Sequence, residues 1–180
     1  MKRTTLFAVV LCMPQLTVAE VIDSAANGFT TVNSVVVTTD RMTAWQAAVQ
    51  VGRWWSSAHT MLGDAARMSI EPRVQGCFCE SLGEEAGVVH LTVMSVMPGT
   101  SLRLSGGLGP LGLMGVYGNM TWDFEDVDGG TQIRFKYAVG GYMNGGLDQV
   151  SGPVDAVLGE ALSRLQSYIE TGNPEPAIVE

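Results

Sequence analysis

The chain has 180 residues, 46% of them hydrophobic and 16% charged, and 10 Lys+Arg against 18 Asp+Glu give a formal net charge of −8. This composition excludes a disordered chain, and the length fits one domain. The acidic balance argues against a nucleic-acid partner, because such a partner requires a basic face that displaces phosphate counterions.

The first 19 residues are predicted to form a secretory signal peptide. Lys2 and Arg3 precede a mostly apolar run over residues 6–18, and Ala19 supplies the small residue that a cleavage site requires. Pro14 interrupts the run, which is too short to span a bilayer, so no stable membrane anchor is expected. The sequence therefore predicts an exported protein, periplasmic or secreted after cleavage near Ala19.

The following elements predict an α+β domain over residues 20–172. A β-branched run at 29–38 predicts a strand, and Asp40 is placed to cap a helix that ends near Gly52, with a further short helical turn at 53–55. Six more strand candidates are separated by turn residues, at 66–71, 74–81, 88–96, 101–105, 119–126 and 132–139. The last two alternate apolar and polar side chains, which indicates a sheet with one buried and one solvated face.

The longest helix is predicted to begin at Ser151. Pro153 suits a first helical turn, apolar residues then recur at helical spacing, and Gly172 with Pro174 marks the end. Residues 173–180 are expected to form a flexible tail.

Signal cleavage would leave two cysteines, Cys77 and Cys79, in an oxidising compartment that permits a disulfide. On one regular strand, however, their Cα atoms would stand about 7 Å apart, at the limit of disulfide geometry. The same separation argues against a zinc site that combines them with His90. We therefore expect free or mixed-disulfide thiols, or two cysteines that simply pack, with no metal and no other cofactor.

The order β-αα-β6-α, together with several motifs, resembles the START-related SRPBCC superfamily. The motifs are Trp54-Trp55 with His59-Thr60, residues 76–80, His90, residues 98–104, residues 107–111 and residues 131–141. The likeness is greatest to the branch related to the Hsp90-ATPase activator domain, which is grouped with polyketide cyclase and lipid-transport proteins. The resemblance implies a helix-grip fold, in which a curved antiparallel sheet of about seven strands wraps the C-terminal helix and leaves an apolar cavity.

Gly107, Gly109 and Gly112 spell the pattern GxGxxG, which in a strand–turn–helix context binds dinucleotides. Pro110 lies inside the motif and the residues after it alternate like a strand, so that context is absent. Two interpretations remain, a flexible apolar loop over a cavity mouth and a sharply bent strand edge.

Acid–base chemistry would need a histidine beside a carboxylate in the cavity. The sequence has two histidines, His59 and His90, and Glu80 is the most plausible partner because its strand is otherwise apolar at Phe78. The alternative is that each histidine only satisfies local polar groups.

The superfamily fold also predicts which side chains face the cavity. The expected ligand contacts are Trp54, Trp55, His59, Met61, Met94, Arg103, Met114, Tyr117, Met120, Trp122, Tyr137 and Tyr142. Most of the apolar members would be buried in any case. Arg103 either meets an anionic group on the ligand or, by strand alternation, faces solvent and pairs with Glu80 or Asp123.

These observations favour an exported protein that holds a small hydrophobic or aromatic molecule, lipid- or polyketide-like, in an internal cavity. One alternative is a cyclase- or dehydratase-like enzyme that uses His59 or Glu80 as general acid or base. The other is an envelope interaction protein whose cavity is filled by its own side chains. The sequence sets neither the ligand nor the oligomeric state.

Overall fold

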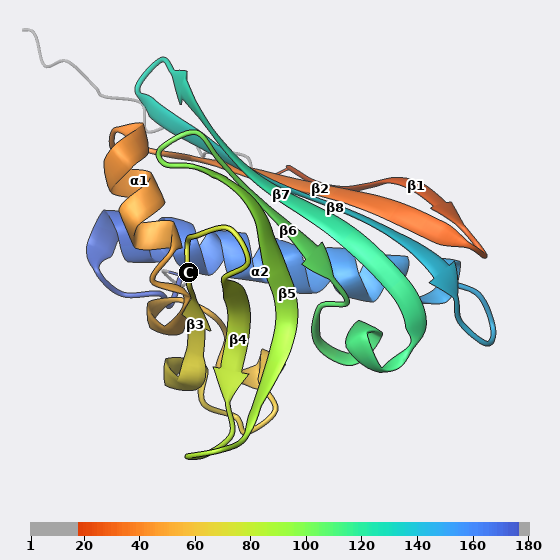
Figure 1. Cartoon of the computed structure of the whole chain (residues 1–180). Coiled ribbons are helices and arrows are strands. Elements are labelled where there is room, and N and C mark those ends of the chain that lie inside the picture. Colours follow the sequence, from red (N-terminus) through yellow and green to blue (C-terminus); the bar gives the residue numbers. More distant parts are fainter. Residues whose placement is uncertain (1–17, 177–180) are drawn as a thin grey trace, which may run out of the picture.

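A curved antiparallel sheet packs against a long C-terminal helix in the computed structural model, which describes residues 18–176 (Figure 1). In chain order the elements are β1 (Val18–Ala25), β2 (Gly28–Val37), α1 (Arg41–Ala48), η1 (Val51–Arg53), η2 (Ser57–His59), η3 (Ala65–Arg67), β3 (Met68–Ile70), β4 (Cys77–Ser81), β5 (Gly87–Met97), β6 (Ser101–Gly106), η4 (Gly109–Leu113), β7 (Gly115–Val127), β8 (Gly130–Tyr142) and α2 (Asp148–Thr171), where η denotes a 3-10 helix.

The sheet has the strand order β1-β2-β8-β7-β6-β5-β4-β3, and every neighbouring pair is antiparallel. β2 pairs with β8 from Gly28 opposite Gly140 to Val37 opposite Thr131, so strands far apart in the chain lie side by side. Alternate residues of both strands are buried, which gives the sheet the single dry face that the sequence predicted. The α+β helix-grip fold is confirmed, with eight strands rather than seven.

The additional strand, β1, was not predicted. It is an edge strand that pairs only with β2, and residues 22–25 are exposed. Val18 and Ala19, which the predicted signal peptide includes, pair with Ser34 and Asn33. The rest of that predicted segment lies outside the described residues, as do residues 177–180 of the predicted tail.

Asp40 caps α1 as predicted. Its Oδ1 accepts hydrogen bonds from the backbone N–H groups of Met42 and Thr43 at 2.9 and 3.0 Å, and the Thr43 hydroxyl donates to its Oδ2 at 2.7 Å. These hydrogen bonds, the one from the Thr43 side chain first, hold the pKa of Asp40 below its usual range. The helix ends at Ala48, before the predicted Gly52, and the chain continues as 3-10 turns.

α2 begins at Asp148, three residues before the predicted Ser151. Ser151 is therefore not a cap, and its hydroxyl instead donates to the carbonyl of Asp148 at 2.9 Å. Pro153 lies inside the helix, where it removes one main-chain hydrogen bond. The helix ends as predicted at Gly172, whose φ of 77° is a left-handed conformation that glycine adopts without strain.

Cys77 and Cys79 form a disulfide, contrary to the prediction of two thiols. The prediction assumed a regular strand, but the pairing of β4 with β5 shifts register between Phe78 and Cys79. The backbone is irregular there, and the Cα atoms of the two cysteines approach to 5.4 Å, within the usual range for a disulfide.

Two further observations concern the described part of the chain. None of its helices is long and apolar enough to cross a membrane. Within residues 18–176, no cluster of three or more His, Cys, Asp or Glu side chains is arranged to hold a metal ion.

Candidate functional site

A cavity of about 370 Å³ lies between α2, the η4 segment, the chain around η2, and β3 and β5. Most of its wall is apolar. The lining residues are Trp55, Ala58, His59, Thr60, Met61, Met68, His90, Leu108, Gly109, Pro110, Leu111, Met114, Val150, Pro153, Val154 and Val157. Five separate stretches of the chain therefore meet around one space.

The α2 part of the wall follows from helical periodicity. Leu158, Ala161, Leu162 and Leu165 are buried against the sheet and anchor the second half of the helix. In its first half, partly buried valines, Val154 among them, pack at the border of the core and also line the cavity. The C-terminal half of the helix is thus buried against the sheet, and its N-terminal half contributes one side of the cavity.

The glycine-rich segment over residues 106–118 contains η4 and forms the second part of the wall. This position agrees with its interpretation as an apolar loop. Tyr137 fastens this segment to the sheet, because its hydroxyl donates to the carbonyl of Gly106 at 2.9 Å and accepts from the backbone N–H of Leu108 at 3.0 Å. Burial raises the pKa of Tyr137 to about 12. Gly118 leaves room for the ring, since a Cβ there would lie 2.4 Å from a Tyr137 ring carbon.

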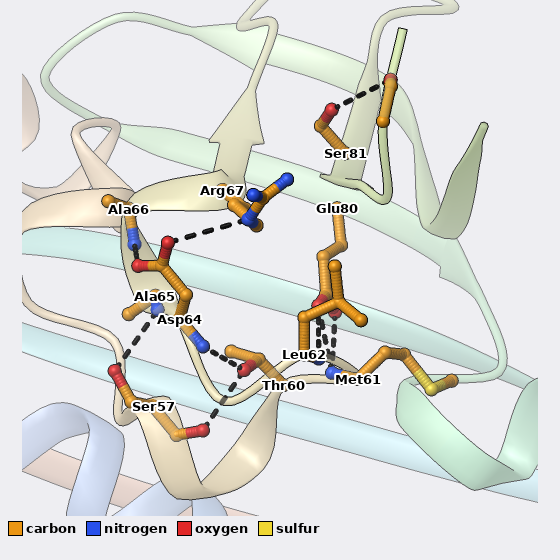
Figure 2. Close-up of polar contacts among 11 residues, drawn as sticks. Ser57, Thr60, Met61, Leu62, Asp64, Ala65, Ala66, Arg67, Glu80 and Ser81 are labelled. Atoms are coloured by element: carbon orange, nitrogen blue, oxygen red, sulfur yellow. Dashed lines mark hydrogen bonds and ion pairs between the residues drawn. The ribbon is translucent and has the colours of Figure 1, made fainter. Parts of the chain in front are cut away.

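The third part of the wall is the loop over residues 57–67, which is cross-linked by its own polar groups (Figure 2). The Thr60 hydroxyl donates to the carbonyl of Ser57 at 3.0 Å and accepts from the backbone N–H of Asp64 at 2.9 Å. The hydroxyl of Ser57 accepts from the backbone N–H of Ala65 at 3.1 Å. These bonds give the loop a defined shape although it contains only single 3-10 turns.

Glu80 of β4 fixes this loop to the sheet. Its carboxylate is fully buried and accepts hydrogen bonds from the backbone N–H of Met61 at 2.8 and 3.0 Å and from that of Leu62 at 3.1 Å (Figure 2). Nε2 of His90 lies 3.4 Å from the same carboxylate. A buried carboxylate needs such donors, because without them its desolvation would not be offset.

His90 faces the interior because of a bulge in β5. Phe78 is paired with Leu91 and Cys79 with Val89, so His90 has no partner in the ladder and both it and Leu91 are buried. In a regular strand two neighbouring side chains would point to opposite faces. The imidazole thus enters the cavity wall, and its Nδ1 is buried without a hydrogen-bond partner among the described residues.

His59 lies in another part of the wall and pairs with α2. Its Nε2 is 2.9 Å from Oε2 of Glu160, and the indole N–H of Trp55 donates to its carbonyl at 3.1 Å. Desolvation raises the pKa of Glu160, but hydrogen bonds from Ser56 and His59 and the nearby positive charges outweigh it and lower the pKa overall. The predicted partner Glu80 therefore belongs to His90 and not to His59.

The twelve predicted ligand contacts divide into three groups. Trp55, His59, Met61 and Met114 line the cavity. Trp54, Met120, Trp122 and Tyr137 are fully buried but lie outside its lining, because they pack with one another and with further aromatic side chains: Trp122 stacks on Phe135 with ring centroids 4.4 Å apart. Met94, Arg103, Tyr117 and Tyr142 are exposed. Arg103 takes the solvent-facing position that its alternation with Leu102 and Leu104 allows, while Asp123 pairs with Arg134 at 3.5 Å.

Sequence reasoning missed most of the wall, and the missed residues carry weak signals. The valines of α2 and the leucines of the glycine-rich segment were visible as apolar residues, but nothing in their spacing distinguishes a cavity from a core. His90 was a candidate acid or base, but its inward direction depends on the bulge. Glu80 was a candidate catalyst, and the structure places it behind His90, outside the cavity lining.

No family model and no curated protein matches the chain. Solved structures do. CalU16 from Micromonospora echinospora is 17% identical, over 91% of this chain and 88% of its own, with a TM-score of 0.54. The Aha1 dimer from Colwellia psychrerythraea is 14% identical, over 79% of this chain and 97% of its own, with a TM-score of 0.55.

DynU16, a protein in the dynemicin biosynthetic locus, is 17% identical over 82% of this chain with a TM-score of 0.58. The match spans about half of that chain, 49% of its length. The fold that these neighbours share with the chain is the one that the sequence resemblance implied. At these identities the likeness shows the fold alone.

Proposed function

We propose that this protein binds a small, largely apolar molecule in the cavity beneath α2. The observation that carries the proposal is the cavity of about 370 Å³, whose wall is mostly apolar. Cavities that hold small molecules typically have volumes of about 300–1,000 Å³ and are mostly apolar with a few placed polar groups. The fold shared with SRPBCC proteins supports the same function.

An interaction protein with a filled interior is the less favoured alternative. Aromatic side chains, Trp54 and Trp122 among them, do fill the centre of the sheet. The space that remains lies at the η4 end, where Met114 and Val154 line it from opposite segments. A protein that used only its outer surface would have no need of such a space.

Native mass spectrometry of the protein purified from its own cells tests the proposal. We expect a population heavier than the polypeptide by the mass of one small molecule, which is released when the protein is denatured. A bare polypeptide mass alone, in a preparation that also fails to take up any added apolar compound, would contradict the proposal.

We also propose that the protein acts outside the cytoplasm. The pattern of residues 1–19 supports export, and the disulfide between Cys77 and Cys79 supports an oxidising compartment. N-terminal sequencing of the protein from its own cells should begin at Glu20. A mature protein that still begins at Met1 would contradict export by this route.

Acid–base catalysis is a second candidate function, and the pair formed by Glu80 and His90 is the observation that favours it. His90 would be the general acid or base, because it lines the cavity, and Glu80 would position it. Incubation of 2-tetralone with the protein in D₂O tests this role, since a general base would accelerate deuterium uptake beside the carbonyl. Uptake no faster than in buffer, or equally fast with His90→Gln, would exclude it.

A further inference from the structure

We infer that the cavity selects apolar ligands that carry a hydroxyl group, and that this hydroxyl bonds Nδ1 of His90. The inference rests on the proposed function, because it names the class of molecule that the same cavity would take. It starts from the one buried side-chain atom in the cavity wall that has no hydrogen-bond partner within residues 18–176.

The His90 ring is held on several sides. Its side chain is 4% exposed, its Nε2 lies 3.4 Å from the Glu80 carboxylate, and the Phe78 ring meets it edge-on with centroids 5.9 Å apart. The bulge in β5 directs the ring inward and leaves His90 without a partner residue in β4. Polar groups that are buried in proteins almost always have partners, so a fixed imidazole whose Nδ1 has none within residues 18–176 indicates a partner such as a bound molecule.

Three other polar side-chain groups of the wall are already bonded. The Thr60 hydroxyl is held by Ser57 and Asp64, the indole N–H of Trp55 donates to the carbonyl of His59, and Nε2 of His59 pairs with Glu160. Nδ1 of His59 belongs to a side chain that is 31% exposed, where water can satisfy it. Among the side chains of the wall, His90 therefore offers the buried nitrogen that a bound molecule can satisfy.

A hydroxyl group suits Nδ1 better than other polar groups do. Because Nε2 donates to Glu80, Nδ1 is an acceptor in the neutral ring and a donor in the charged ring. A hydroxyl can donate and accept, so it matches both states, whereas a carbonyl matches only the charged ring. An apolar molecule without a hydroxyl would leave the nitrogen unpaired, which lowers its affinity.

Binding of 2-naphthol and naphthalene, measured by calorimetry on the full protein, tests this inference. We expect 2-naphthol to bind at least about tenfold more tightly, although it is the less hydrophobic of the two. In His90→Gln, whose amide keeps a donor for Glu80, the ratio should fall to within about threefold. Met94→Leu, an apolar exchange at an exposed position of the same strand and outside the cavity wall, should leave the ratio unchanged.

The outcomes separate the two proposals. If neither compound binds the wild-type protein, the proposed function is contradicted. If both bind with equal affinity, or if His90→Gln keeps the preference, the cavity function stands and the hydroxyl inference is overturned, with water as the partner of Nδ1. If His90→Gln does not fold, the ¹⁵N chemical shift of His90 Nδ1 in the wild-type protein tests the inference instead. This chemical shift should change when 2-naphthol binds and stay constant when naphthalene binds. Identical changes with the two compounds would overturn the inference.

Discussion

The carboxylate of Glu80 lies 3.4 Å from Nε2 of His90 and accepts hydrogen bonds from the backbone N–H groups of Met61 and Leu62. One fully buried residue of β4 thus connects β5 with the loop over residues 57–67. Both of these segments line the cavity. The shape of the site therefore depends on a residue that does not itself face the cavity.

Removal of this connection should destabilise the protein. Glu80→Ala leaves the N–H groups of Met61 and Leu62 and one nitrogen of His90 without an acceptor, so the free energy of unfolding should fall by about 2–4 kcal/mol. Glu80→Gln keeps one acceptor oxygen and should lose less. Urea denaturation measures both changes, with Glu84→Ala as an exposed control of the same residue type. A loss no larger than that of the control would contradict the assigned role.

A bulky side chain in the wall should close the cavity without unfolding the protein. Val154→Trp places an indole in the space beneath α2, and we expect binding of apolar probes to weaken by at least about tenfold. Ala156→Trp adds the same group to an exposed position of the same helix and should bind normally. Calorimetric titration of both variants checks the prediction, and equal binding would place the ligand elsewhere.

The stabilising contribution of the Tyr137 hydroxyl, which fastens the η4 segment, should depend on pH. Tyr137→Phe removes the hydroxyl that bonds Gly106 and Leu108, which should lower the free energy of unfolding by about 1–2 kcal/mol. Burial raises the pKa of this phenol from 10.0 to about 12, so its contribution is complete below pH 10 and is lost as the pH rises from 10 to about 12. The stability difference between wild type and variant, measured by denaturation across this range, should shrink. A difference that stays constant to pH 12 would contradict the burial of this hydroxyl.

The disulfide should stabilise the protein modestly, because it closes a very short loop. For a loop of this size the entropy model gives about 1.5 kcal/mol. The double variant Cys77→Ser/Cys79→Ser should therefore melt a few degrees lower, and a reducing agent should lower the Tm of the wild type but not that of the variant. An unchanged wild-type Tm under full reduction would show that the bridge has no part in stability.

Most of the fold was predictable because its signals are local. The alternation of apolar and polar residues identified β7 and β8. Asp40 marked the start of α1, and Gly172 marked the end of α2. β1 carries no such signal, since residues 20–25 of this edge strand are exposed or only half-buried. The start of α2 was misplaced because Gly152 and Pro153 suggest a helix boundary, whereas the observed helix includes both.

The site was less predictable because it depends on two non-local features. Strand alternation correctly placed Trp122 inside and Arg103 outside, but it does not distinguish a side chain that lines a space from one that fills it. The bulge beside Cys79 turns His90 inward and permits the disulfide, and it arises from the pairing of two strands rather than from either sequence alone. Because His90 turns inward and lines the cavity, Glu80, which was expected in the site, lies behind His90 and outside the lining.

The central claim is that the space beneath α2 holds a small apolar molecule. A crystal structure of the protein soaked with 6-bromo-2-naphthol tests it most directly, because the anomalous signal of bromine locates the compound. We expect a bromine peak inside the cavity, between Met114 and Val154, with the hydroxyl beside His90. Bromine peaks confined to the outer surface, with the cavity occupied only by water, would contradict it.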